Sequence, residues 1–129
     1  MSPVWGFTLS FALTLVLLAT VVVTGRRALR RVHIACVVCT LLSLAFTIRE
    51  AYALGRVYDV YSAGMIAPIH LTLAKINTIA FLAPIITGIR TLFVPSTRRL
   101  HARVAYAVVT LTVVCAITGF VMILLADPR

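Results

Sequence analysis

The sequence predicts an all-α integral membrane protein, a four-helix antiparallel bundle with signs of two tandem helical hairpins. Of its 129 residues, 62% are hydrophobic and only 12% are charged. A soluble domain is about half apolar and a quarter charged, so this chain cannot hide its apolar side chains in one water-soluble core. The apolar residues also fall into four stretches of the length that a bilayer requires, which is about 20 residues.

The four predicted spans lie within a single transmembrane domain of residues 1–129, and they cover about residues 3–24, 33–54, 66–91 and 104–126. Helices are expected in each span, because an open strand would leave its backbone groups unpaired in lipid. A membrane barrel would show strands of about ten residues with alternating polarity. No such pattern is visible in this sequence.

Charge in the connecting segments predicts the orientation. The first and third connections carry eight arginines: Arg26, Arg27, Arg30, Arg31, Arg90, Arg98, Arg99 and Arg103. Basic loops stay on the cytoplasmic side, so both termini are expected outside the cytoplasm, in a bacterial inner membrane. The acidic residues fall on the other side: Glu50, Asp59 and Asp127. We interpret the net charge of +9 as a basic collar against anionic lipid headgroups, and not as a nucleic-acid surface.

A weak internal repeat runs through the chain. The second span opens with RRVHIACVVC and the fourth with RRLHARVAYA, and each follows a helix that ends in Thr-Gly, at Thr24-Gly25 and Thr87-Gly88. The repeat places His33 and His101 at equivalent positions and at the same membrane depth. It is the basis for predicting two tandem hairpins.

Each of these histidines begins a stripe of mostly small or polar residues at helical spacing. On the second span the stripe continues through Cys36, Thr40, Ser43, Thr47 and Glu50, and on the fourth through Ala105, Val108, Thr112, Cys115, Gly119 and Met122. Small and hydroxylated residues are typical of helix interfaces in membranes. We therefore expect the two stripes to face each other, with both histidines at the inner mouth of the bundle.

Two imidazoles that face each other across a helical bundle can ligate the iron of a b-type haem. His33 and His101 are accordingly the candidate ligands, and haem b is the candidate cofactor. The alternative is that each histidine sits in the headgroup zone beside arginine and bonds to water or phosphate. Metal binding and proton transfer remain further alternatives.

Ionisable residues within the predicted spans form a second candidate site, because such residues are costly in lipid. The expected polar cluster in the outer half comprises Arg49, Glu50, His70, Lys75 and Asn77. Lys75 enters the bilayer deeply enough to need a partner, for which Glu50 is the natural choice. The cluster fits a structural ion-pair network, a ligand site for a quinone headgroup, metal or haem propionate, or contact with a partner subunit.

The remaining motifs predict little chemistry. Cys36 and Cys39 form a C-x-x-C within a helix, without the following histidine that c-type haem attachment needs, so packing is the expected role. No hydrolase triad, phosphate-binding loop or zinc-protease motif is present. The sequence thus predicts no catalytic residues and no dedicated metal site.

The segments IHLTLAKINTIAFLAPIITGIRTL and RRLHARVAYAVVTLTVVCAITGF resemble a family of small four-helix bacterial membrane proteins of poorly defined function. That family includes maturation factors of haem-copper oxidases. The matching elements are His70 with Leu73-Ala74, the basic residues around His101, and Thr118-Gly119. The chain departs from the family where Ala53 follows Tyr52 in place of a histidine, so an outer histidine pair with His70 is not available.

These observations predict a non-catalytic accessory subunit or assembly factor of a respiratory membrane complex, with haem held by His33 and His101. Other membrane subunits and anionic lipids are the expected partners. The alternatives are a cofactor-free structural subunit of a larger complex and a small transporter, the latter resting only on Glu50 and Lys75.

Overall fold

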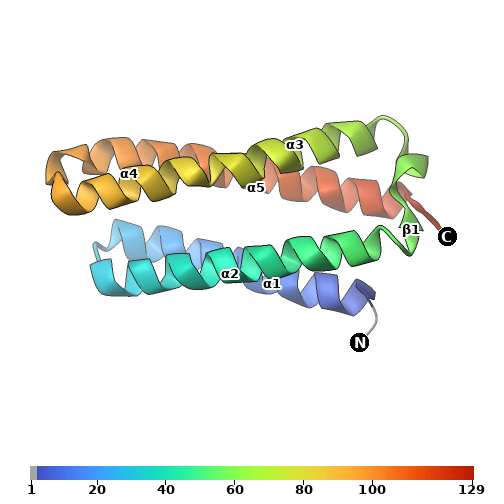
Figure 1. The fold of residues 1–129 in the computed structure, drawn as a ribbon, viewed down its shortest axis with the longest axis horizontal. Coiled ribbons are helices and arrows are strands. Elements are labelled where there is room, and N and C mark those ends of the chain that lie inside the picture. Colours follow the sequence, from blue (N-terminus) through green and yellow to red (C-terminus); the bar gives the residue numbers. More distant parts are fainter. Residues whose placement is uncertain (1–2) are drawn as a thin grey trace. The chain divides into compact units, whose positions relative to one another are not determined.

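The computed structural model describes residues 3–129 and confirms the all-α, four-helix fold class (Figure 1). Four helical segments in this range are long and apolar enough to cross a membrane. The chain divides into two compact units. One comprises the residues up to Tyr58 together with Pro128–Arg129, and the other comprises Asp59–Asp127. Each unit is one helical hairpin, as the internal repeat predicts.

The first hairpin pairs α1 (Pro3–Arg26) with α2 (Arg30–Leu54). A tight turn joins them, in which Ala28 takes the left-handed conformation with φ of 56°. The amide of Leu29 closes the turn by donating to the carbonyl of Thr24 at 3.1 Å. The turn therefore sets the register that brings the first residues of α2 against the last residues of α1.

Small residues let α1 and α2 pack closely. The buried positions on α1 follow one helix face, and they are Gly6, Ser10, Thr14, Leu18 and Thr24. Midway along the hairpin, the Thr14 hydroxyl lies 2.7 Å from the hydroxyl of Ser43 and 2.9 Å from that of Thr47. Interhelical hydroxyl bonds and close backbone approach are the interactions that hold helices together where water supplies no hydrophobic drive.

The second hairpin pairs α5 (Arg98–Leu125) with α3 (Ile66–Ala80) and α4 (Leu82–Phe93). The third predicted span is therefore interrupted at Phe81. Pro84 explains the interruption, because it has no amide hydrogen for the carbonyl four residues earlier and its ring crowds that turn. At the interruption Asn77 is buried, and its side-chain oxygen accepts a 3.1 Å hydrogen bond from Thr112.

Short elements connect the helices. The 3-10 turns are η1 (Val60–Ala63) and η2 (Pro95–Thr97), and the two-residue strands β1 (Tyr58–Asp59) and β2 (Asp127–Pro128) pair with each other. The Asp59 side chain caps η1 by accepting from the amide of Tyr61. Gly64 follows η1 with φ of 66°, a conformation that glycine adopts without steric cost.

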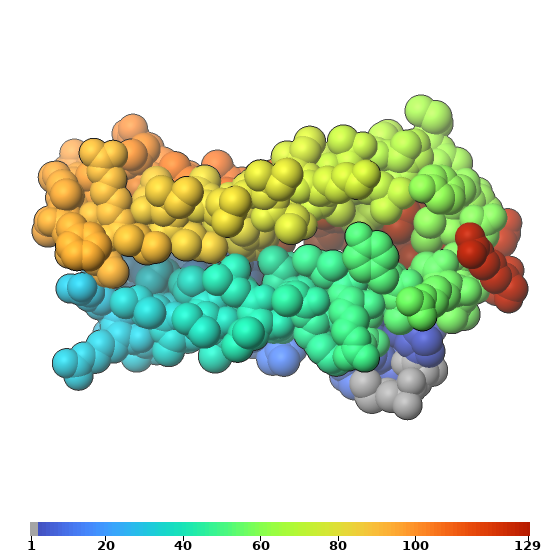
Figure 2. Space-filling model, in the orientation of Figure 1, coloured from blue at the N-terminus to red at the C-terminus, as the bar shows by residue number. Residues whose placement is uncertain are grey.

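The outward faces of the helices are apolar. Side chains such as Leu42, Ile79, Phe120 and Leu124 are more than 60% exposed. Figure 2 shows the surface that α2 presents and the surface that α3 and α4 present, coloured by position in the chain. In water such exposed apolar side chains would be costly, so their extent agrees with a chain whose solvent is lipid.

Two helices begin earlier than the predicted spans, whereas α1 and α3 begin at the predicted residues, Pro3 and Ile66. The second was expected from residue 33 and the fourth from residue 104, whereas α2 begins at Arg30 and α5 at Arg98. The apolar stretches mark the hydrocarbon core, but a helix can continue into the headgroup zone, where arginine side chains remain hydrated.

Candidate functional site

His33 lies at the arginine-rich end of the first hairpin and bonds back to α1. Its Nδ1 atom is 3.0 Å from the carbonyl oxygen of Val21 and 3.3 Å from the hydroxyl of Thr24. Gly25 lies beside the ring, and a β-carbon added there would come within 3.1 Å of His33 Cε1. The glycine thus lets the imidazole rest directly against the backbone of α1.

His101 repeats this arrangement in the second hairpin. Its Nδ1 atom is 3.2 Å from the hydroxyl of Thr87 on α4. A β-carbon added at Gly88 would again come within 3.1 Å of the ring, at Cε1. The Thr-Gly pairs that mark the repeat in the sequence are therefore the partners of the two histidines.

His70 makes the same contact a third time, between α3 and the far end of α5. Its Nδ1 atom is 3.2 Å from the hydroxyl of Thr118, and the ring also bonds to the backbone of Cys115. A β-carbon added at Gly119 would lie only 2.6 Å from His70 Cε1. Each of the three histidines in the chain is thus seated on one of its three Thr-Gly pairs.

The three threonines favour one tautomer of these rings. Each hydroxyl donates its single hydrogen to a carbonyl of its own helix: Thr24 to Thr20, Thr87 to Ala83, and Thr118 to Cys115. With the hydroxyl hydrogen on these carbonyls, the threonine oxygen accepts from the ring, an arrangement that favours the hydrogen on histidine Nδ1. The neutral ring consequently holds its lone pair on Nε2, the atom with which such a histidine binds a metal.

The orientation of Nε2 separates His33 and His101 from His70. Measured from the β-carbon position of the facing glycine, Nε2 lies at 3.9 Å in His33 and 3.8 Å in His101, farther than the other two ring atoms given. In His70 the same distance is 3.1 Å, equal to that of Nδ1. His33 and His101 therefore turn Nε2 away from the supporting helix, and His70 does not.

Glu50 occupies a comparable place at the opposite end of the first hairpin, away from its arginine-rich turn. Its carboxylate lies against Gly6 of α1, where an added β-carbon would collide with Oε2. Arg49 is the nearest cation, with Nη1 4.0 Å from Oε1. That arginine is 76% exposed and stands 5.7 Å from the centre of the Phe46 ring, so the ion pair is loose.

The predicted polar cluster is only partly assembled within either hairpin. His70 and Asn77 share the face of α3 that packs on α5, as their spacing predicts. Lys75 is exposed on another face of α3, and it has no ion-pair partner among the described residues of its own hairpin. The pairing of Glu50 with Lys75 joins the two units and stays a prediction.

Both small-residue stripes contain residues that contact the neighbouring helix of their own hairpin, and the expectation that the two stripes face each other stays a prediction. Ser43 and Thr47 on α2 contact α1. Thr112 and Gly119 on α5 contact α3, through Asn77 and His70 respectively. These residues thus pack within their own hairpin, because a short connection places consecutive helices next to each other. The sequence alone did not identify Thr24, Thr87 and Thr118 as partners of the histidines. The equal number of Thr-Gly pairs and histidines, three of each, was a usable signal.

The other candidate groups assemble no further centre. The three cysteines are unpaired, and no cluster of three or more histidine, cysteine or acidic side chains suited to a metal ion occurs within residues 3–129. The candidate ligands among the described residues are therefore the single imidazoles of His33, His70 and His101. Comparison of the chain with protein-family models, with curated proteins and with solved structures finds no match.

Proposed function

We propose that this protein is a non-catalytic accessory subunit or assembly factor of a respiratory complex in a bacterial inner membrane, and that it binds haem b through His33 and His101. The observation that carries the proposal is the hydrogen-bond contact of Nδ1 in both imidazoles, with the Val21 carbonyl and Thr24 hydroxyl for His33 and with the Thr87 hydroxyl for His101. A histidine that ligates iron is held in this way by a bond from its other ring nitrogen.

The matching environments of the two histidines support their joint role. Each lies in the first turns of a helix that opens with two arginines, and each rests on a glycine with Nε2 directed away from it. Arginines at the same end also provide counter-charges for the propionate groups of haem b. When bound, the haem would supply one-electron chemistry, and the protein would orient its ligands and exclude water.

The resemblance to small four-helix membrane proteins that include haem-copper oxidase maturation factors supports a place in respiration. Its matching elements are two of the three seated histidines, His70 and His101, and the pair Thr118-Gly119. A chain with so few buried side chains also has little interior for a catalytic pocket, which favours an accessory role.

The visible spectrum of the purified protein tests the proposal. We expect a Soret band and sharp α and β bands after reduction, as two axial histidines produce. His33→Gln and His101→Gln should each abolish these bands, because glutamine can still donate to the supporting carbonyl or hydroxyl but does not replace imidazole as an iron ligand. His70→Gln is the matched control and should keep the spectrum.

Two results would refute the haem assignment. One is a colourless protein from cells supplied with a haem precursor. The other is a spectrum that persists in both His33→Gln and His101→Gln. A colourless protein would leave the cofactor-free subunit as the remaining reading, and co-purification with oxidase subunits would then test that role by itself.

A further inference from the structure

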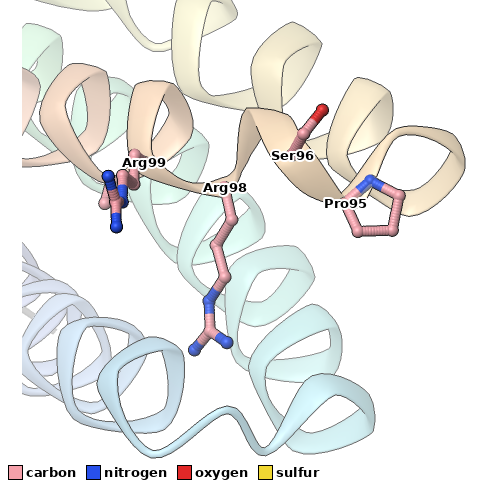
Figure 3. Close-up of a pocket in the computed structure, with 5 residues that line it drawn as sticks. Pro95, Ser96, Arg98 and Arg99 are labelled. Atoms are coloured by element: carbon pink, nitrogen blue, oxygen red, sulfur yellow. The ribbon is translucent and has the colours of Figure 1, made fainter.

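An open depression lies where η2 meets the start of α5. Its lining residues are Pro95, Ser96, Arg98, Arg99 and Ala102, and its volume is about 550 Å³. Figure 3 shows the side chains of Arg98 and Arg99 extending to the same side of the ribbon from the first turn of α5. The lining thus combines two arginines with the apolar surfaces of Pro95 and Ala102, while the Ser96 side chain extends to the other side of the ribbon from Arg98.

The electrostatics of this region favour an anion. The first turn of α5 contains no acidic residue, and the Thr97 side chain makes no capping bond to it. The start of a helix carries partial positive charge from its backbone amides, so Arg98 and Arg99 add like charge where a carboxylate is normally found. A bound anion would relieve this repulsion.

The position along the helix narrows the class of anion. The apolar part of α5 begins within two turns of the depression, at Val104, so the depression lies at the boundary between hydrocarbon and water. An anionic phospholipid presents a phosphate group at this depth and an apolar glycerol backbone just below it. Arginine binds phosphate through paired N–H donors, and Pro95 and Ala102 offer surface to the apolar part.

We propose that this depression binds the phosphate group of one anionic phospholipid, for which phosphatidylglycerol is the simplest example. The site differs from the diffuse attraction of the basic collar because it requires the shape of the depression as well as its charge. Its test measures bound lipid and is carried out without haem, so its outcome is separate from that of the haem proposal.

Native mass spectrometry of the detergent-solubilised protein tests the site, with phosphatidylglycerol or phosphatidylcholine as the added lipid. We expect one phosphatidylglycerol per chain, retained in preference to phosphatidylcholine. Arg98→Gln with Arg99→Gln should weaken it roughly 30-fold, since each basic residue near a membrane surface contributes about a fivefold factor. Ala102→Phe fills the depression without changing charge and should also lose the bound lipid.

The matched control is Arg30→Gln with Arg31→Gln, which removes the same charge from the start of α2. This variant should keep the bound lipid, and far-UV circular dichroism checks that all variants stay helical. Equal loss in both arginine pairs, or retention in Ala102→Phe, would overturn the proposal in favour of a diffuse collar. Displacement of the lipid by equimolar glycerol 3-phosphate would identify a soluble phosphate as the ligand and would also overturn it.

Discussion

At the scale of single residues, the distinctive feature is how each imidazole is held. A side-chain hydrogen bond between membrane helices stabilises a protein by only about 0.6 kcal/mol on average. The bonds of His33, His70 and His101 therefore contribute in total about 2 kcal/mol to the free energy of unfolding. Their larger effect is on orientation, because the threonine favours one tautomer of the ring.

Nitrogen NMR of the histidine side chains in the haem-free protein measures that tautomer. We expect all three neutral rings to carry their hydrogen on Nδ1, because the threonine oxygens and the Val21 carbonyl accept from it. Thr87→Val removes the threonine contact of His101 alone and should shift the nitrogen resonances of that ring, while those of His33 stay unchanged. Hydrogen on Nε2 in the unsubstituted protein would be inconsistent with the geometry described here.

The sequence identified the histidines but not their partners. A histidine and its Thr-Gly pair can be close in the chain, as for His33 and Thr24, or far apart, as for His70 and Thr118. The second kind of pairing depends on the register of two helices over their whole length, which composition does not specify. Lys75 shows the same limit, since its helix face could be assigned only once Asn77 was seen to face α5.

At the scale of elements, hydroxyl groups at the middle of the first hairpin act as a small polar contact in an apolar setting. The Thr14 hydroxyl lies within 3 Å of the hydroxyls of Ser43 and Thr47, and Thr14 is only 6% exposed. In lipid these groups have no competing water. The contact thus favours one register of α1 against α2 over others that would separate the three hydroxyls.

Thr14→Val is expected to destabilise the protein by about 1 kcal/mol, because it removes two interhelical bonds while keeping the shape of the side chain. Unfolding in mixed micelles, followed by circular dichroism, gives the free energy. Thr20→Val is the control, since Thr20 bonds only to the carbonyl of Val16 on its own helix. Equal stability of the two variants would show that the hydroxyl contact does not hold the hairpin.

Most elements could be predicted from the sequence because lipid imposes a strict length of apolar chain. The interruption at Phe81 was less accessible, although Pro84 within a span is a recognised cause. Many membrane helices contain a proline and continue without interruption, so Pro84 alone does not predict where the helix is interrupted. The starts of α2 and α5 differ from the predicted spans because hydropathy marks the residues that fit the hydrocarbon core. It does not mark where the helical conformation begins.

At the scale of the whole chain, the amino-acid composition indicates a lipid environment, and the charge of the connections predicts the orientation in the membrane. A 62% hydrophobic chain with apolar helix faces belongs in a bilayer, and the grouping of arginines in two of three connections predicts which side they occupy. The internal repeat extends from sequence into structure, since each hairpin carries a histidine on a Thr-Gly pair at its arginine-rich end. The orientation and the haem proposal depend on both arginine-rich ends lying on one side.

Labelling of single cysteines with a membrane-impermeant thiol reagent tests that dependence most directly, in a background without the three natural cysteines. We predict that Leu29→Cys and Ser96→Cys, in the two arginine-rich connections, react only after the cells are disrupted. Ser62→Cys, in the connection between the hairpins, should react in intact cells. Reaction of Leu29→Cys from outside, or of only one of the two arginine-rich connections, would contradict the shared cytoplasmic position of His33 and His101.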